Sequence, residues 1–454
     1  MFAPFFGVLD VYVPKVHLVS LERFMVVIRV GSRQLGQVTM EVTVSLDARY
    51  SVASDGSVWS QFGMARQFWE RYLEVFDTVR IVARAARVQK VPAGWAPVNG
   101  KNILFHGVPD FEGPWQCVKR YPAVREAIRS ATPAHGAVIL RVGSQIANIM
   151  EGQLRQRNYP YALEVVGDPY EVFAPGVVDH PLRRFFRWHF SRQLRRQCSR
   201  AIGVAYVTEG VLQERYPATS VSVGISDVDL PRESVWNNGF LIHYSNVELD
   251  SAGVGRPCGR HRQHGPYQLV TVGSLAQLYK GTDVLIEAVA SCVRAGVDLT
   301  AVIVGDGKYR PDLMAQAERI GMASRIRFAG QVTAGAPVRR ILDEADLFVL
   351  PSRTEGLPRA LVEAMARGLP CIGSAVGGIP ELLDASELVP AGDSDALAAK
   401  IQEVLRDPLR MDEMSAQNLR NSLKYLNSVL AERRRLFYTH VRDYTQRWEA
   451  LQTA

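Results

Sequence analysis

The sequence predicts an α/β protein with two doubly wound, Rossmann-like domains, each a mostly parallel sheet covered by helices. Three observations lead to this prediction. The 454 residues exceed what one compact core usually accommodates. Short apolar runs typical of strands alternate with helical patterns along most of the chain. The stretch LDSAGVGRPCGRHRQHGP, residues 249–266, has no apolar period and is rich in Gly, Pro and basic residues, as expected of an interdomain linker.

The first predicted domain spans residues 40–248. It opens with the strand MEVTVSLDARY, and a helical pattern that follows carries Phe68, Tyr72 and Phe76. Further strand-like runs are AVILRVG, YALEVVGD and AIGVAYVT. Residues 1–39 precede this pattern, so we treat them as an N-terminal appendage; a native extension and an artefact of start-codon choice both stay open.

The second predicted domain spans residues 267–430, where the alternation is clearer. Its strands are YQLVTVGS, LTAVIVGDG, RIRFAG, LFVLPS and PCIGS, and each is followed by a helical segment of about three turns. Residues 431–454 read as a final helix that packs back on the first domain. Two such domains would bring the carboxyl ends of their strands to a common cleft, which is where open α/β sheets bind ligands.

Composition narrows the partners and the cellular compartment. The formal net charge of +7 favours an anionic partner, such as a phosphorylated metabolite, a membrane surface or a nucleic acid. The five cysteines are far apart and lack CxxC spacing, which indicates neither a disulfide framework nor a zinc site and predicts a cytoplasmic protein. No apolar run approaches the roughly 20 residues that span a bilayer, and the apolar N-terminus lacks the basic start of a signal peptide.

Two glutamates stand out in the segment PSRTEGLPRALVEAMARGLPCIGS. Glu355 and Glu363 flank a strongly helical pattern, and a buried charge needs a partner or a ligand. Over a helix this interval would rise about 12 Å. Backbone N–H groups of Gly356 and Leu357 and of the turn that opens the helix would favour phosphate, and Pro358 suits that first turn.

The second half resembles the nucleotide-binding domain of GT-B glycosyltransferases, in particular the large retaining family 4. The resemblance rests on VGSLAQLYKGTDVLIEA, VIVGDGKYRPDL, IRFAGQV and ADLFVLPSRTEGLPRALVEAMARGLPCIGSAVGGIPELL, in that order, and covers about residues 267–405. The first half resembles the family's acceptor domain only in outline, with DGSVWSQFG and EVVGDPYEVF as its best points. The resemblance implies the GT-B fold, in which two Rossmann-like domains face each other across a cleft.

The resemblance also implies roles for the donor site. Glu355 would contact the donor sugar, Glu363 would bind the ribose hydroxyls, and Lys280 would bind the diphosphate. Many relatives carry Arg where this chain has Ser274, so one cation of the diphosphate clamp is missing or comes from elsewhere. The expected donor-binding residues are Gly273, Ser274, Lys280, Val332, Glu355, Gly356, Leu357, Pro358 and Glu363.

The catalytic and acceptor-side candidates are fewer. Besides Glu355 and Lys280, Asp168 at the end of EVVGD is a candidate catalytic residue, and Asp55 and Gly56 lie in a loop expected to approach the acceptor. Loop aspartates are more often turn formers than catalytic residues, so this alternative stays open for both. The nine histidines show no HExxH or HxH spacing, so we expect no metal, and the absence of GxxxxGK[ST] excludes a P-loop.

A third feature is the basic segment LRRFFRWHFSRQLRRQCSR, residues 182–200. Its apolar residues recur every fourth position among seven arginines, from Leu182 through Phe186, Phe190 and Leu194 to Cys198. The stripe could pack in the core with the arginines in solvent. It could instead attach the protein to an anionic membrane, at the inner face, if the acceptor is lipid-linked. Nucleic-acid binding is disfavoured because no recognised module accompanies the charge.

Together these features predict a retaining glycosyltransferase. It would transfer a hexosyl unit from a nucleotide diphosphate sugar, with UDP placed first, to a hydroxyl acceptor in cell-surface polysaccharide or glycolipid assembly, and it would need no other cofactor. Two alternatives remain at this point. One is a GT-B nucleotide-sugar epimerase or hydrolase, and the other is a non-catalytic partner protein that binds sugar nucleotides.

Overall fold

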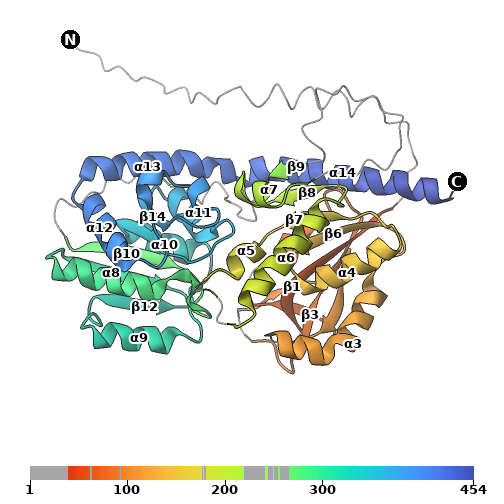
Figure 1. The fold of residues 1–454 in the computed structure, drawn as a ribbon, viewed down its shortest axis with the longest axis horizontal. Helices are drawn as coiled ribbons and strands as arrows, with labels where there is room; N and C mark the ends of the chain where they lie inside the picture. Colours follow the sequence, from red (N-terminus) through yellow and green to blue (C-terminus); the bar gives the residue numbers. More distant parts are fainter. Residues whose placement is uncertain are drawn as a thin grey trace, which may run out of the picture. The chain divides into compact units, whose positions relative to one another are not determined.

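The computed structural model describes residues 39–218, 241–243, 249, 254–255 and 265–453, apart from 62–63, 93, 112, 176 and 178–179. These residues form two sheets of mainly parallel strands, each flanked by helices (Figure 1). The predicted fold class of two α/β domains is therefore confirmed. Nearly all of the expected appendage and most of the expected linker lie outside the described residues.

The first sheet is built around β1 (Glu41–Val52), which pairs in parallel with strands on both sides. Both of its faces are covered, since Val42 and the next residue, Thr43, point to opposite faces and are both buried. On one side lie β3 (Thr78–Arg87) and β5 (Ile103–Pro109); on the other lie β6 (Ala137–Val142), β7 (Ala162–Val165), β8 (Val204–Tyr206) and β9 (Leu241–His243). The short strand β2 (Val58–Ser60) pairs antiparallel with the carboxyl end of β1, and β4 (Ala96–Pro97) pairs antiparallel with β2.

Among the described residues between β2 and β9, helices alternate with the strands of this sheet. They are α2 (Arg66–Glu70), α3 (Gly113–Ala131), α4 (Gln145–Gln156), α5 (Pro169–Val172), α6 (Arg183–Cys198) and α7 (Val211–Arg215). The helix α4 has both a capped start and one apolar face. Ser144 caps it by accepting a hydrogen bond from Ala147 N, and Ile146, Met150 and Leu154 are buried at intervals of four residues.

The helix expected through Phe68, Tyr72 and Phe76 is shorter than predicted, since α2 ends at Glu70. Arg71 Nε donates to Phe68 O at 2.7 Å, and this carbonyl would accept from Tyr72 N if the helix continued. Tyr72 N instead donates to Trp69 O at 3.1 Å. The chain proceeds in turns that still bury Tyr72 and Phe76, so the apolar pattern was read correctly while the helix length was wrong.

The second sheet is parallel throughout, in the order β12-β11-β10-β13-β14-β15. Its strands are β10 (Tyr267–Val272), β11 (Leu299–Val304), β12 (Ile326–Gly330), β13 (Leu347–Leu350), β14 (Cys371–Ser374) and β15 (Leu388–Val389). The chain moves outward from β10 to β12, then returns to β13 on the other side of β10. This reversal between β10 and β13 is a topological switch point, where sheets of this kind bind ligands at their carboxyl ends.

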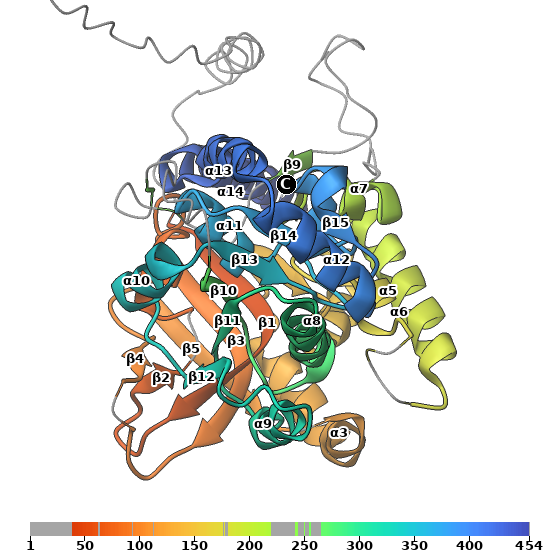
Figure 2. The same ribbon diagram turned by 90° about the vertical axis from the view of Figure 1, so that its left-hand side faces the viewer.

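Helices cover both faces of the second sheet (Figure 2). The helices α8 (Thr282–Arg294), α9 (Arg310–Arg319) and α12 (Ser394–Leu405) share one hydrophobic core with Leu269, Ile303 and Ile372. On the other face lie α10 (Ala336–Glu344) and α11 (Arg359–Ala366), and α13 (Pro408–Ser422) packs on α11. The helix α13 was not predicted from the sequence.

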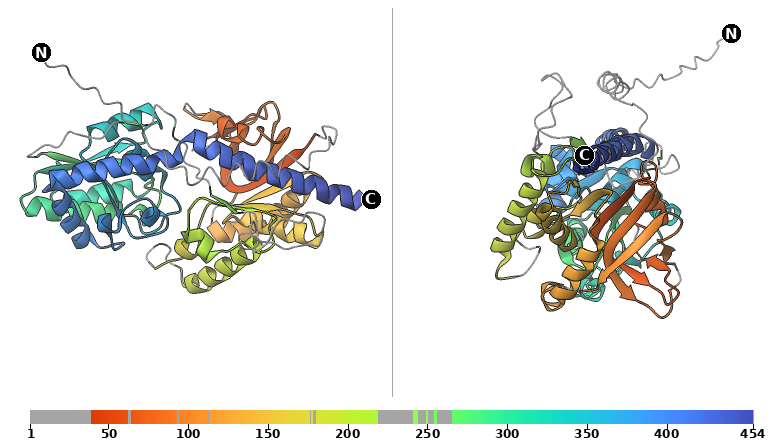
Figure 3. Two further views of the ribbon diagram at one scale, coloured as in Figure 1. Left: turned by 90° about the horizontal axis from the view of Figure 1, so that it is seen from above. Right: turned by 90° about the vertical axis from the view of Figure 1, so that its right-hand side faces the viewer.

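The last helix, α14 (Asn427–Thr453), follows α13 and packs on the first sheet (Figure 3). His440 Nε2 donates to Ile202 O at 2.9 Å, and burial lowers the pKa of His440, which favours the neutral ring. Further along the helix, Glu449 Oε1 accepts from Gly136 N at 2.7 Å. The chain thus returns to its first domain after completing the second.

A buried charge network anchors α14 in the first domain. Arg141 and Glu164 form an ion pair with side chains 3% and 2% exposed. Two tyrosines donate to the same carboxylate oxygen, Glu164 Oε1: Tyr72 at 2.9 Å and Tyr438 of α14 at 3.1 Å. Because an unpaired buried charge is costly, these hydroxyl donors help to keep the ion pair stable.

Replacing Tyr438 by Phe should therefore destabilise the protein. The variant loses one hydrogen bond to a buried carboxylate, so we expect the free energy of unfolding to fall by about 1.5 to 3 kcal/mol. Urea denaturation followed by circular dichroism measures this change. Tyr121→Phe, which alters an exposed tyrosine of α3, is the matched control; equal stability of the two variants would contradict the role assigned to the network.

Candidate functional site

The loops after the strands of the second sheet interlock closely at its carboxyl edge. Gly305, after β11, has φ +139°, and a Cβ there would overlap the carbonyl oxygen of Gly273, after β10. Gly281, just before α8, has φ +68°, and a Cβ there would overlap Pro351 O, after β13. Glycine is therefore required at both positions, and the loops form one continuous surface.

A buried ion pair joins two of these loops. Lys280 ends the short 3₁₀ helix η4 (Leu278–Lys280) after β10, and Glu355 follows β13. Lys280 Nζ lies 2.6 Å from Glu355 Oε1, and the two side chains are 18% and 7% exposed. Ser352 Oγ donates to the same oxygen at 2.7 Å. Lys280 and Glu355, which were expected to bind the diphosphate and the sugar of the donor, are thus in direct contact.

A second ion pair fixes the loop that carries Glu355. Both terminal nitrogens of Arg353 bind the carboxylate of Asp283, at 2.8 and 2.7 Å, and Arg353 N donates to Tyr279 O at 2.7 Å. The hydrogen bonds that Arg353 donates to Asp283 raise the pKa of Arg353. The sequence analysis missed this pair, since its partners lie far apart in the chain and neither belongs to a recognised spacing.

Glu363 lies on α11 and is more accessible than Glu355, with 27% of its side chain exposed. Its Oε1 accepts from Arg359 Nε at 2.9 Å, one turn earlier. The helix begins only at Arg359, and Pro358 is its extended N-cap residue rather than part of the first turn. The expectation that a helical rise separates the two glutamates is therefore wrong, because Glu355 lies before the helix.

The residues between the two glutamates contact the first domain. A Cβ at Gly356 would lie 3.3 Å from Val166 O, directly after β7. Leu357 packs against the hydrophobic core of the first sheet. The loop that carries Glu355 thus touches both domains.

The other expected donor residues also lie at this edge. Ser274 Oγ accepts from Ala276 N at 3.2 Å and is exposed, Gly273 runs beside the Lys280 side chain, and Val332 follows β12. Arg310, which the sequence analysis missed, is partly exposed at the start of α9 and pairs with Asp306 at 3.2 Å. It is a candidate for the cation that Ser274 does not supply.

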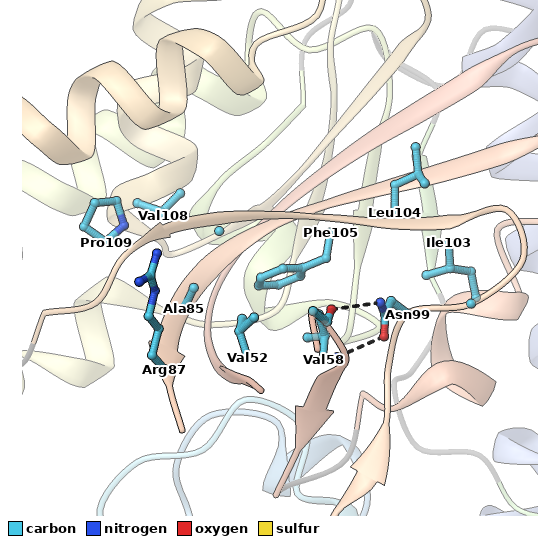
Figure 4. Close-up of a pocket in the computed structure, with 13 residues that line it drawn as sticks. Val52, Val58, Ala85, Arg87, Asn99, Ile103, Leu104, Phe105, Val108 and Pro109 are labelled. Atoms are coloured by element: carbon cyan, nitrogen blue, oxygen red, sulfur yellow. Dashed lines mark hydrogen bonds between the residues drawn. The ribbon is translucent and has the colours of Figure 1, made fainter. Parts of the chain in front are cut away.

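The two acceptor-side candidates form the turn between β1 and β2. Asp55 Oδ1 accepts from Ser57 N at 2.9 Å and from Ser57 Oγ at 2.6 Å, and these bonds lower the pKa of Asp55. Gly56, with φ +82°, borders a pocket of about 700 Å³ in the first domain. Val52, Val58 and Phe105 are among the side chains lining this pocket (Figure 4). The hydrogen bonds of Asp55 and the positive φ of Gly56 account for these residue types in a turn. The pocket beside them is a candidate acceptor region.

Asp168 has a structural role. It caps α5, is only 5% exposed, and its Oδ1 accepts from Tyr170 N at 2.9 Å and from Tyr216 OH at 2.5 Å. Its other oxygen binds the guanidinium of Arg215. Both oxygens are occupied by groups of the first domain, so we remove Asp168 from the catalytic candidates. Within the part of the chain that the structure describes, no three His, Cys, Asp or Glu side chains form a metal-binding group.

Comparison with known proteins identifies the family. The family described as "Glycosyl transferases group 1" matches residues 266–407, which include all the donor-site candidates. Protein CapJ of Staphylococcus aureus is 25% identical over 376 residues, covering 82% of this chain and 88% of that protein. The putative colanic acid biosynthesis glycosyltransferase WcaL of Salmonella typhimurium is 37% identical over 150 residues, covering 31% of this chain and 36% of that protein.

Two further likenesses extend over most of the chain. Anabaena Alr3699/HepE, solved in complex with UDP and glucose, gives a TM-score of 0.57 at 16% identity and covers 91% of this chain and 100% of that one. This likeness supports the GT-B fold. The 2-deoxystreptamine glucosyltransferase of Streptomyces kanamyceticus is 32% identical over 342 residues, covering 73% of this chain and 81% of that protein. The chain therefore belongs to the group 1 glycosyltransferases.

Proposed function

We propose that the protein is a retaining glycosyltransferase of family 4 that moves a hexosyl unit from a nucleotide diphosphate sugar to a hydroxyl acceptor. The observation that carries this proposal is the ion pair between Lys280 and Glu355, which joins two loops at the carboxyl edge of the second sheet. A function in cell-surface polysaccharide or glycolipid assembly is supported by WcaL, a relative named for colanic acid biosynthesis.

UDP is the nucleotide we place first, since HepE was solved with UDP and glucose. The diphosphate would lie against the start of α11, where the first backbone N–H groups of a helix have no partner within it and the helix dipole favours negative charge. The accessible carboxylate of Glu363, one turn into the helix, would accept hydrogen bonds from the ribose hydroxyls. Lys280 and Arg310 would supply positive charge on the other side.

Glu355 would act at the sugar. In the proposed reaction the bond from the anomeric carbon to the phosphate oxygen breaks, and a bond to the acceptor oxygen forms on the same face. The proton of the acceptor hydroxyl passes to the departing phosphate. Positive charge develops on the anomeric carbon, and a fixed carboxylate nearby stabilises it more in the transition state than in the bound substrate. The ion pair and Ser352 hold this carboxylate in one orientation.

A surface on α6 supports attachment to an anionic membrane. The predicted apolar stripe is buried only in its second half, at Leu194 and Cys198. Leu182, the first residue of that stripe, is 54% exposed and forms an exposed row with Phe185 and Trp188, which are 51% and 58% exposed; arginines flank this row. None of the helices that the structure describes is long and apolar enough to cross a bilayer. We propose that this row inserts between lipids while the arginines bind anionic headgroups.

Glu363→Ala should mainly weaken nucleotide binding. The ribose hardly changes during transfer, so this contact contributes equally to bound substrate and transition state. A hydrogen bond to a charged group is worth about 1.5 to 3 kcal/mol, which predicts a loss of more than tenfold in UDP affinity by calorimetry. Glu318→Ala, at an exposed position of α9, should bind UDP like the wild type. Unchanged affinity in Glu363→Ala would refute its placement at the ribose.

Glu355→Gln should instead reduce turnover. The variant keeps the side chain's size and an oxygen for Ser352 but removes the charge that would stabilise the anomeric carbon. We expect kcat to fall more than tenfold while UDP affinity stays within about threefold of the wild type. The assay measures UDP release from a UDP-sugar with and without acceptor extract, so it also distinguishes transfer from hydrolysis. Full activity, or a loss confined to UDP affinity, would show that the carboxylate is wrongly assigned.

Changing Phe185 and Trp188 together to Ser should abolish sedimentation with vesicles that contain anionic phosphatidylglycerol, because the exposed aromatic row is lost. UDP affinity should be unchanged, since α6 belongs to the first domain. Leu409→Ser, which removes a 76% exposed leucine from the second domain, is the control. Failure of the wild type to sediment would end the membrane proposal and leave the transferase proposal intact.

A further inference from the structure

A carboxylate of the second domain binds backbone groups of the first. Glu381 ends the 3₁₀ helix η5 (Ile379–Glu381), which follows β14. Its Oε2 accepts from Glu209 N at 2.6 Å, and its Oε1 accepts from Gly210 N at 3.0 Å and from Val211 N at 2.8 Å. Three consecutive N–H groups of the first domain are therefore satisfied by one side chain of the second.

These N–H groups lie at the start of α7, where a helix normally needs a cap. The N-cap residue, Gly210, has no side chain that could serve, and α7 shows no side-chain cap from that position. Thr208 Oγ1 accepts from Leu212 N at 3.1 Å, so the next N–H is satisfied within the first domain. The Glu381 carboxylate of the second domain thus acts as the cap at the start of α7, a helix of the first domain.

The same loop of the second domain leads to the donor site. Gly378 N donates to Gly356 O at 2.8 Å, which ties the loop after β14 to the residue directly after Glu355. A Cβ at Gly378 would lie 3.3 Å from Thr208 Cγ2, so the two domains are in close contact here. A short chain of contacts therefore connects α7, through Glu381 and Gly378, to the loop that carries Glu355.

Glu381 also lies near the point where the chain crosses between domains. Leu249 N donates to Tyr425 O at 3.3 Å, and Asn427 N donates to Leu249 O at 2.9 Å, so the two crossing segments pair with each other. Asn421 Nδ2 donates to Leu382 O at 3.4 Å, so the residue that follows Glu381 lies beside the segment that leads to Tyr425. Burial and then the carboxylates of Glu209 and Glu381 raise the pKa of Tyr425. Where two domains move as a hinge, a few loop or element-terminal residues absorb the change.

We infer that Glu381 is a positioning residue, whose carboxylate clamps α7 to the loop after β14 and so sets the orientation in which Glu355 meets the first domain. The inference rests on the proposed function for its effect on rate, while the clamp itself is independent of it. Charge matters here because a carboxylate offers two acceptor oxygens and attracts the positive end of a helix.

The test compares Glu381→Gln and Glu381→Ala with the wild type. Glutamine keeps the size but offers one acceptor oxygen, and its NH₂ group would face a backbone N–H. We expect kcat to fall about fivefold or more in Glu381→Gln and further in Glu381→Ala, while UDP affinity and the KM for the UDP-sugar stay within twofold. Small-angle X-ray scattering should show a larger radius of gyration in both variants without UDP, because the clamp is released. Glu318→Ala should match the wild type in every measurement.

The outcomes separate the clamp from a merely structural contact and from the proposed function. Unchanged kcat and unchanged scattering would overturn the inference, and so would a loss of UDP affinity as large as the loss of kcat. If Glu381→Ala fails to fold, Glu381→Gln carries both measurements. If the wild type transfers no sugar, the proposed function fails, yet a larger radius of gyration in Glu381→Gln still supports the clamp.

Discussion

The ion pair between Lys280 and Glu355 is the interaction on which the candidate site depends. It joins the loops after β10 and β13, the strands between which the chain reverses its direction across the sheet. Both side chains are largely buried, so removing either would leave the other as an uncompensated charge. A second ion pair, between Arg353 and Asp283, stabilises the same loops. Gly281 allows the close approach of the loops that both ion pairs require. In the proposed function, these contacts would hold the charged groups of the candidate donor edge in fixed positions, as electrostatic catalysis requires.

The second constraint is that the loop between the two glutamates touches both domains. Glu363 points from a helix of the second domain, whereas Gly356 and Leu357 pack on the first. A donor at α11 would thus be bound by the second domain and would lie close to the first domain. The long helix α14, fixed to the first domain through Tyr438 and its buried carboxylate partner, ties the two domains together a second time. In the proposed reaction the protein contributes mainly orientation and charge, and both depend on this double connection.

Much of the fold could be predicted from sequence, and so could the placement of the candidate donor residues at one sheet edge, because both depend on local patterns. The strands and most helices follow from apolar periods, and the donor edge follows from the rule that parallel strands present their carboxyl ends together. What could not be predicted are contacts between distant segments. The pairing of Lys280 with Glu355, the occupation of Asp168 by Arg215 and Tyr216, and the clamp at Glu381 each require knowing which loops meet. Two helices differ from their sequence patterns for local reasons. In α2, which ends early, the Arg71 side chain donates to the Phe68 carbonyl that a longer helix would use. In α6, residues spaced every four positions drift away from the buried face, because a helix has 3.6 residues per turn.

Hydrogen–deuterium exchange with and without saturating UDP tests the central claim most directly, because it reports on every backbone segment at once. The account predicts slower exchange in residues 273–281, 330–333 and 351–363, the loops at the carboxyl edge of the second sheet, and no change around the β1–β2 turn at Asp55. Protection confined to the first domain, or none in residues 351–363 at saturating UDP, would contradict the assignment of the donor site to this edge.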